Sequence, residues 1–256
     1  MDPSTQITLA LTHFNREAML LESFAQVIDD PRIGEVVISD DASTDGSYER
    51  LVERFQGSKV KVYQNPTNLD CYRNKAEAIR LCTSDWVILL DSDNIIGKDY
   101  LDVLFSLPSW DKDVIYCPDF AMPHFSYVHW GGKMIDRHNV SSLMGCPSPC
   151  RVMTRRGMVT KMVLDPISSR FRCLLNTANY FLHRDSYLEV WEGGVNPHTA
   201  DSIYMSFLWF RSGRRYYVVP GLRYIHRIHP MSHYRLHNHK TGNFLPEVEK
   251  KLMDLI

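Results

Sequence analysis

The stretch WVILLDSDN, residues 86–94, joins five apolar residues to two carboxylates that follow them almost at once. The apolar run predicts a buried strand, so Asp91 and Asp93 lie where that strand ends. Open α/β sheets bind their ligands at the carboxyl ends of the strands. Carboxylate oxygens suit Mg²⁺ or Mn²⁺, ions that usually bridge the phosphates of a substrate. This stretch therefore predicts a metal-assisted site for a phosphorylated substrate.

Short apolar runs alternate with segments of helical periodicity on the N-terminal side of this stretch. We expect strands at residues 7–11, 35–39, 60–63 and 86–90, and helices at residues 17–28, 48–55 and 73–81. This alternation is typical of an α/β fold with a largely parallel sheet and helices on both faces. Further along, we expect strands at 113–116, 179–182 and 216–219, a buried helix at 200–210, long loops over 118–149 and a tail helix at 246–256.

Length and composition allow one sizeable core, because the chain has 256 residues and 44% hydrophobic content. The net charge of −1 favours no particular partner, but the charges are unevenly distributed. Residues 202–246 contain no Asp or Glu and are rich in Arg. An acidic first half facing a basic second half suits a metal-bound anionic substrate between them. The alternative is that the basic residues form ordinary solvated faces.

The six cysteines form no Cys-x-x-Cys pair, and the N-terminus has no basic-then-apolar leader. No apolar run approaches the length that a bilayer-spanning helix needs. We therefore expect a cytoplasmic protein with reduced thiols. Peripheral attachment to a membrane is left open.

Polar groups follow several of the expected strands, and a further carboxylate, Asp201, opens the expected helix at 200–210. Carboxylates crowded together repel and lose solvation, and a divalent cation would compensate both effects. For Asp41 and Asp93 we favour a functional role, because both follow apolar strands at the binding edge. For Asp45 we favour a simple role in capping a turn.

Three segments in this order, ITLALTHFNR at 7–16, VVISDDASTDGS at 36–47 and LLDSD at 89–93, closely resemble the inverting GT-A glycosyltransferases of family two. The resemblance covers nearly the whole chain and is strongest up to Asp93. It implies a GT-A fold, in which a Rossmann-like, mostly parallel central sheet is flanked by helices and joined by a smaller acceptor-side sub-lobe. It further implies a nucleotide-sugar and metal-binding half at 1–115, an acceptor-binding half of the same domain at 116–232 and a C-terminal tail helix at 233–256.

The same resemblance implies roles for individual residues. Asp201 matches the catalytic base, although Ala200 replaces the acidic neighbour that the family usually has there. His229 lies in an Arg-x-His-Pro-x-Ser element whose His can complete the metal shell or touch the diphosphate, with His226 as a competitor for that role. Glu192 is a weaker candidate for touching a sugar. The expected metal ligands are Asp93, Asp91 and His229, and the expected nucleotide-binding residues are Thr12, Asp41, Asn68, Arg73, Asp91 and Ser92.

The resemblance also implies the partners. We expect a nucleotide-sugar donor, with a UDP-sugar favoured, Mn²⁺ or Mg²⁺ as the cofactor, and a hydroxyl acceptor on a glycan or glycoconjugate. The basic residues also allow an anionic acceptor. A homo-oligomer formed through the C-terminal tail is a further possibility.

Two other classes of protein compete with this interpretation. A phosphohydrolase of the haloacid dehalogenase type carries an Asp-x-Asp-x-Thr/Val motif, which residues 91–95 approach but Ile95 breaks. A non-enzymatic module could instead bind nucleic acid or another anionic polymer through the basic C-terminal region. A nucleotidyltransferase is disfavoured, because residues 12–16 contain no glycine.

Overall fold

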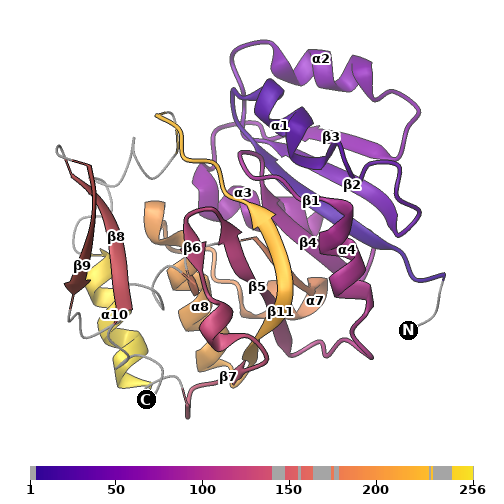
Figure 1. Ribbon diagram of the computed structural model, residues 1–256. Coiled ribbons are helices and arrows are strands. Elements are labelled where there is room, and N and C mark those ends of the chain that lie inside the picture. The colour runs from indigo at the N-terminus through magenta and orange to yellow at the C-terminus, as the bar shows by residue number, and fades with distance from the viewer. Residues whose placement is uncertain are drawn as a thin grey trace.

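The computed structural model describes residues 4–139, 148–154, 157–163, 174–175, 179–230, 232 and 244–255. Within these residues the chain forms one nine-stranded sheet with helices on both faces, and a separate two-stranded hairpin (Figure 1). The hairpin consists of β8 (Ser148–Thr154) and β9 (Gly157–Val163).

The large sheet has the order β3-β2-β1-β4-β10-β5-β11-β7, with β6 paired to β5. Its strands are β1 (Ile7–His13), β2 (Ile33–Asp40), β3 (Val60–Gln64), β4 (Trp86–Asp91), β5 (Val114–Met122), β6 (Phe125–Ser126), β7 (Met134–Ile135), β10 (Tyr180–His183) and β11 (Arg215–Ile225). β1 to β4 are parallel to one another, and β5 and β11 form a second parallel pair. β10 lies antiparallel between β4 and β5 and joins the two parallel groups.

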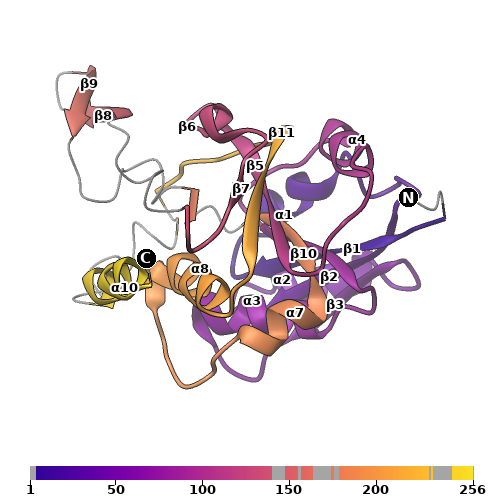
Figure 2. The ribbon, with the colours of Figure 1, turned by 90° about the horizontal axis from the view of Figure 1, so that it is seen from below.

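Helices cover both faces of this sheet. They are α1 (Glu17–Phe24), α2 (Ser47–Arg54), α3 (Asp70–Arg80), α4 (Lys98–Phe105), α7 (Arg184–Val190), α8 (Asp201–Arg211) and α10 (Phe244–Asp254), with 3₁₀ turns η1 (Val128–Trp130) and η2 (His198–Ala200). α3, α7 and α8 pack against one another on one face, and α1 and α4 lie on the other (Figure 2). The expected alternation of strands and helices is confirmed.

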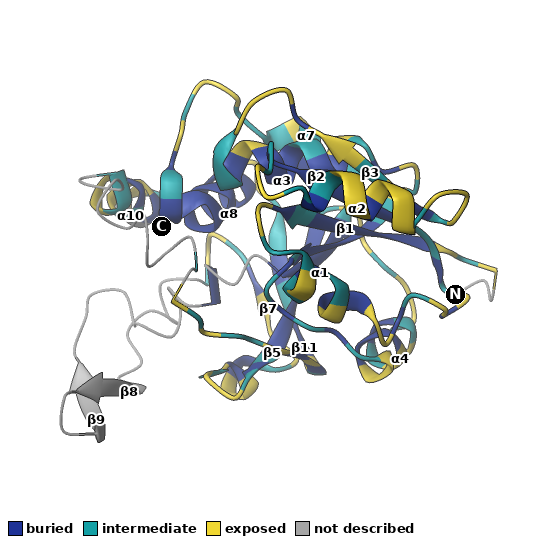
Figure 3. Cartoon of the chain, turned by 90° about the horizontal axis from the view of Figure 1, so that it is seen from above, coloured by how far each residue is buried: buried dark blue, intermediate teal, exposed yellow. Residues whose placement is uncertain are grey.

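The core lies between the parallel strands and the helices that cover them. β1, β2 and β4 are buried at most of their positions on both faces, as central parallel strands are. α2 lies at the edge of the fold and exposes most of its outer surface (Figure 3). α8 is buried along residues 201–210, and Gly213, with φ of +83°, follows its end in the left-handed conformation that commonly terminates helices.

Two strands are longer than the sequence predicts. β5 continues past Pro118 to residue 122, and β11 continues past Pro220 to residue 225. The register between them shifts between Val219 and Arg223, so the chain accommodates the prolines in an irregularity rather than ending the strands. The carboxylate of Asp119 accepts a hydrogen bond from the Gly221 amide at 2.7 Å and satisfies this irregular backbone. The long loops expected over 118–149 are therefore partly strand.

The tail helix α10 packs against α8, which opens with Asp201. Val248 and Leu252 are buried in this contact, and the Phe244 ring lies 5.4 Å from the ring of Tyr204. The apolar face of the tail thus docks on the body of its own chain. The predicted boundary between the two halves, at residue 115, falls inside β5, and the division into halves stays a prediction. An oligomer formed through the tail also stays a prediction. No helix among the residues described is long and apolar enough to cross a bilayer.

Candidate functional site

The predicted site residues of β1 and β4 lie side by side at the carboxyl edge of the sheet. Thr12 pairs in register with Asp91 on one side and with Ser39 on the other. Asp41 directly follows β2, and its amide donates a hydrogen bond to the carbonyl of His13 at 2.8 Å. Parallel strands end at the same edge, so the apolar runs that form the strands also bring their polar C-terminal residues together.

Asp41 is surrounded by amide groups beside this edge. Its Oδ1 accepts hydrogen bonds from the Leu69 amide at 2.7 Å and from Asn65 Nδ2 at 3.1 Å. Asn68 Nδ2 donates to the Asp41 carbonyl at 3.1 Å. Burial raises the pKa of Asp41 to about 6, although the hydrogen bonds from Leu69 and Asn65 oppose this shift. The predicted residues Asp41 and Asn68 are therefore in contact.

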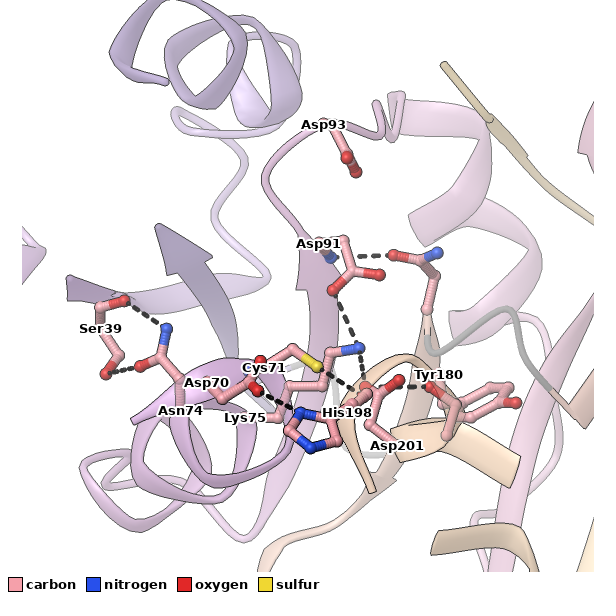
Figure 4. Close-up of polar contacts among 12 residues, drawn as sticks. Ser39, Asp70, Cys71, Asn74, Lys75, Asp91, Asp93, Tyr180, His198 and Asp201 are labelled. Carbon is pink, nitrogen blue, oxygen red and sulfur yellow. Dashed lines mark hydrogen bonds and ion pairs between the residues drawn. The ribbon is translucent and has the colours of Figure 1, made fainter. Parts of the chain in front are cut away.

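Asn74 connects the residues around Asp41 to the sheet. Its amide donates to the Ser39 carbonyl at 3.2 Å, and its Oδ1 accepts from Ser39 Oγ at 2.6 Å (Figure 4). The same Oδ1 accepts from Asn65 Nδ2 at 3.0 Å. The neighbouring Arg73, the predicted nucleotide-binding residue, is exposed on α3. Among the residues described, no polar contact connects Arg73 with the other predicted site residues.

Asp201 and Asp91 are joined by a lysine. The Nζ atom of Lys75 lies 2.6 Å from Asp201 Oδ2 and 3.1 Å from Asp91 Oδ1 (Figure 4). Burial favours the neutral amine, but the two carboxylates outweigh it and hold the pKa of Lys75 well above its usual value. Burial raises the pKa of Asp91 to about 6, with Lys75 opposing. The backbone amide of Asp91 donates to Asn179 Oδ1 at 2.9 Å.

Asp93 faces a different set of partners. Its Oδ2 accepts a hydrogen bond from His229 Nε2 at 3.0 Å and pairs with Arg16 Nη1 at 3.1 Å. Burial disfavours the Asp93 carboxylate, yet the hydrogen bond from His229 and the charge of Arg16 hold its pKa below the usual value. The structure thus brings together Asp93 and His229, two of the three predicted metal ligands.

The donor atoms at Asp93 fit a small divalent cation. Carboxylate oxygens are ligands that Mg²⁺ and Mn²⁺ favour, and imidazole is a common ligand of divalent transition metals. The separation of 3.0 Å between Asp93 Oδ2 and His229 Nε2 is that of a hydrogen bond donated by Nε2, so a bound cation would take the place of that proton. Across the described ranges, no group of three or more His, Cys, Asp or Glu side chains is arranged for a metal ion. A cation here would take two protein ligands and complete its shell with phosphate oxygens and water, as Mg²⁺ commonly does.

Arg227 fixes the backbone that carries Asp93. Its guanidinium donates to the carbonyls of Asp93, of Ser92 at 3.3 Å and of Met19 at 2.7 Å, and it pairs with Glu22 at 2.5 Å. The predicted nucleotide-binding residue Ser92 is buried here and contributes its carbonyl to this contact. Arg227 lies in the same Arg-x-His-Pro element as His229 and holds the loop in place.

The structure separates the two competing histidines. His229 contacts Asp93, whereas the ring of His226 packs against Phe125 at 5.2 Å. Burial lowers the pKa of His226, and its Nδ1 atom has no hydrogen-bond partner among the described residues. The weaker candidate Glu192 accepts from Tyr204 at 2.9 Å and pairs with an arginine of α8. His229 is thus the histidine positioned beside the acidic cluster.

The turn before Asp201 is clamped to the start of α3. Asp70 Oδ2 accepts hydrogen bonds from His198 Nδ1 at 3.0 Å and from Asn196 Nδ2 at 3.3 Å, and the Cys71 thiol donates to the His198 carbonyl (Figure 4). Asp70 and His198 both have positive φ values, of 66° and 50°. Backbone in this region is strained for residues other than glycine and is typical of functional sites.

Sequence reasoning missed the residues that hold these carboxylates in place, namely Arg16, Asn65, Lys75 and Asp70. A signal existed for Lys75. Tyr72, Ala76 and Ile79 form the apolar face of α3, and a lysine between them occupies a buried stripe. A buried lysine requires carboxylate partners. Arg16 and Asn65 lie in loops, where spacing carries no comparable signal.

Comparison with known proteins places this chain in a family. The sequence profile described as "Glycosyl transferase family 2" matches residues 8–158. Abequosyltransferase RfbV of Salmonella typhimurium is 28% identical over 116 residues, which cover 43% of this chain and 35% of that protein. The chain therefore spans about a third of the curated relative.

Solved structures with low sequence identity share the fold. S. aureus TarS 1–349 in complex with UDP matches 98% of this chain and 65% of that chain, at 17% identity and a TM-score of 0.59. Mannosyltransferase PcManGT of Pyrobaculum calidifontis, in complex with GDP-Man and Mn²⁺, matches 97% of this chain and 65% of that chain, at 13% identity and a TM-score of 0.59. GalNAc-T7 with UDP, GalNAc and Mn²⁺ matches 89% of this chain and 45% of that chain, at 15% identity and a TM-score of 0.57. These likenesses confirm the predicted GT-A fold.

Proposed function

Because this chain belongs to glycosyl transferase family 2, we propose that it transfers a sugar from a nucleotide-diphosphate donor to a hydroxyl acceptor, with inversion at the anomeric carbon and with Mn²⁺ or Mg²⁺ as cofactor. One observation carries the proposal. Asp91, Asp93 and Asp201 converge at the carboxyl edge of the sheet, where Lys75 joins Asp91 to Asp201. This arrangement supports a diphosphate site beside a candidate base.

The chemistry assigns a separate task to each carboxylate. Asp93 and His229 would hold the cation, whose positive charge stabilises the departing diphosphate. Asp201 would accept the proton of the acceptor hydroxyl as that oxygen attacks the sugar. A single displacement of this kind inverts the anomeric centre. It needs one base, in contrast to the pair of carboxylates that a glycoside hydrolase uses.

The Asp41 carboxylate supports recognition of a nucleobase. With a pKa of about 6, Asp41 is mostly ionised at pH 7 and accepts an N–H donor. Uracil and guanine both present a ring N–H to such an acceptor. Structural neighbours bind nucleotides of both kinds, since TarS was solved with UDP and PcManGT with GDP-Man. For this chain we favour UDP. Thr12, on the strand between Ser39 and Asp91, is proposed to line the same side of the donor.

The first experiment is a thermal-shift screen of UDP, GDP, CDP and ADP with and without Mn²⁺. A ligand that binds only the folded protein stabilises it by about 2.7 kcal/mol at a hundredfold excess over its dissociation constant. For a chain of this size that corresponds to a rise in Tm of about 5–10 °C. We expect one diphosphate, with UDP favoured, to give this rise only when Mn²⁺ is present.

The second experiment measures UDP release from a panel of UDP-sugars, with water and simple glycans as acceptors. Asp201→Asn should bind UDP with Mn²⁺ as wild type does but release UDP about 10²–10⁴ times more slowly. Asp45→Asn is the matched control, since Asp45 lies at the same edge but only caps Ser47. Full turnover in Asp201→Asn would contradict the assignment of the base, and metal-independent nucleotide binding would contradict the cation site.

These experiments also test the competing classes. In a phosphohydrolase of the dehalogenase type Asp91 is the nucleophile, yet here its Oδ1 contacts Lys75 and the chain belongs to another family. Release of inorganic phosphate from simple phosphate esters would favour that class. Nucleic-acid binding that needs no metal and falls steeply with salt would favour the binding module. A glycan or glycoconjugate as the acceptor is also part of the proposal. So is a cytoplasmic location of the protein, either free or attached to a membrane surface.

A further inference from the structure

Lys75 is 6% exposed, and both of its ionic partners lie on other elements of the fold. It projects from α3 and lies among apolar neighbours such as Tyr72, Ala76 and Ile79. A buried ammonium group is costly unless it is paired, so a lysine in this stripe depends on its two carboxylates. Those carboxylates are Asp91 on the donor side and Asp201 at the start of α8.

The contacts of Asp201 are asymmetric. Lys75 Nζ lies 2.6 Å from Oδ2, and the hydroxyl of Ser202 reaches the same oxygen at 3.4 Å. Among the residues described, no hydrogen bond is made to Oδ1. Lys75 therefore occupies one oxygen of the carboxylate and leaves the other for the hydroxyl that is to be deprotonated. The turn before Asp201 is itself held by Asp70, so backbone and side chain are fixed by different contacts.

This contact also links the two halves of the reaction. Asp91 ends β4, and Asp201 comes 110 positions later along the chain, at the start of α8. Lys75 contacts both, so it sets the base relative to the strand that carries the donor-side carboxylates. A misplacement of about 1 Å in a catalytic group can lower a rate about a hundredfold. A fixed charge between the two carboxylates is a direct way to keep this separation constant.

Resting on the proposed transferase activity, we infer that Lys75 is a positioning residue that locks the catalytic base Asp201 to the donor-side carboxylate Asp91. It neither takes up the acceptor proton nor holds the cation. Its loss is therefore expected to lower kcat and to leave the KM for the donor nearly unchanged.

The test replaces Lys75 with methionine, which keeps an unbranched apolar side chain, one atom shorter, and removes the charged amino group. Lys59→Met is the matched control, because Lys59 Nζ also contacts two oxygens, the carbonyls of Asp30 and Ile33, but lies away from the site. The probe is the UDP-sugar that wild type turns over fastest, and UDP release is measured. We expect Lys75→Met to lower kcat at least 30-fold with KM within threefold, and Lys59→Met to leave both within threefold.

A second readout does not depend on turnover. Lys75→Met leaves Asp91 and Asp201 buried without their shared counter-charge, so its Tm should fall. Adding Asp201→Asn removes one of these charges, and the double variant should recover at least half of that loss. A lysine that merely filled space would give additive losses instead. Where Lys75→Met does not fold, Lys75→Gln takes its place, because glutamine keeps N–H donors without the charge.

The outcomes separate this inference from the proposed function. If wild type releases UDP from no donor, the proposed function fails. If wild type is active and Asp201→Asn is not, but Lys75→Met keeps its kcat within threefold, the role of Lys75 is overturned while the function stands. A loss confined to KM would place Lys75 in donor binding, and failure of both lysine variants to fold would make it a structural counter-ion. Either of these results overturns the positioning role.

Discussion

Asp41→Asn should make the protein more stable while it weakens nucleotide binding. Asp41 is 4% exposed, and burial raises its pKa to about 6 from an ordinary value near 3.8. Asparagine has the same shape and carries no charge. Its Oδ1 can still accept from the Leu69 amide and from Asn65, so the substitution removes the cost of a buried charge and leaves both hydrogen bonds in place.

The size of the effect follows from the difference in pKa between the folded and unfolded states. A carboxyl with a raised pKa in the folded state costs no stability below pH 3.8, and the cost grows as the pH rises towards 6. For a shift of this size the cost is about 2 kcal/mol at pH 5 and about 3 kcal/mol at pH 8, where it is nearly constant. The gain in stability from Asp41→Asn should therefore be about 1 kcal/mol larger at pH 8 than at pH 5.

Urea denaturation of both proteins at pH 5 and pH 8 measures this difference, since urea does not change the ionic strength. Asp45→Asn provides a control of opposite sign. Burial favours the neutral form of Asp45, but hydrogen bonds from Ser47 outweigh it and lower its pKa. Because both pH values lie above the ordinary pKa of 3.8, Asp45→Asn should lose stability by nearly the same amount at pH 5 and at pH 8. The Asp41→Asn protein should also bind UDP about 10–100-fold more weakly than wild type. It loses the hydrogen bond from the nucleobase to a charged acceptor, and such bonds contribute about 1.5–3 kcal/mol.

One result would refute the reasoning about Asp41. If Asp41→Asn changes the free energy of unfolding by the same amount at both pH values, the carboxyl ionises in the folded protein as it does in the unfolded chain. The burial of Asp41 would then carry no electrostatic cost. If stability rises as expected but UDP binds as in wild type, the electrostatic argument holds and the assignment of Asp41 to the nucleobase is wrong.

Three further changes probe other parts of the molecule. Asp93→Ala should abolish the dependence of UDP binding on Mn²⁺, measured by titration calorimetry, and a retained metal requirement would exclude Asp93 as a ligand. His198→Ala removes the hydrogen bond to Asp70 ahead of the base and should lower kcat several-fold without changing UDP affinity; unchanged turnover would show that the clamp is dispensable. Leu252→Ala should lower the free energy of unfolding by about 2–5 kcal/mol, because Leu252 is buried. Urea denaturation measures this loss, with Lys251→Ala on the exposed side of α10 as the control. Equal stabilities of the two variants would mean that the tail is undocked in solution.

The position of the site could be predicted from the sequence because strand ends are local features. Each apolar run ends at a polar residue, and parallel pairing then fixes which residues become neighbours. Thr12 pairs with Asp91 for this reason, although 79 positions separate them in the chain. The same logic brings Asp41 to the edge beside His13. Residues that directly follow buried parallel strands are thus the ones that sequence reasoning places best.

The orientation of β10 could not be predicted in this way. Residues 180–183 form a short apolar run, and such a run fits a parallel or an antiparallel neighbour equally well. Its direction depends on where the chain arrives from, which is a property of the whole fold. The consequence matters for the site, because the residue before β10, Asn179, accepts the hydrogen bond from the Asp91 amide. A strand of the opposite direction would place a different residue there.

The partners of the carboxylates were the least predictable part, since they come from loops and helices rather than from strand ends. Arg16 reaches Asp93 from the loop after β1, and Lys75 reaches two carboxylates from α3. A spacing rule describes residues within one element, and these contacts join separate elements. Only the requirement that buried charges be paired could have indicated Lys75, and that requirement does not identify its partners.

These partners explain why the edge tolerates three carboxylates before any ligand binds. Lys75 and Arg16 supply two positive charges against the three negative charges of Asp91, Asp93 and Asp201, so the cluster carries about one net negative charge. That remainder is small enough for the fold to hold and still attracts a cation. A divalent ion at Asp93 would make the cluster positive, which is the sign that a diphosphate requires. On the proposed function, the anionic donor would therefore bind favourably only after the cation. A lysine shared by two carboxylates would also fix the distance from Asp91 to the proposed base, which a second arginine at Asp93 would not do.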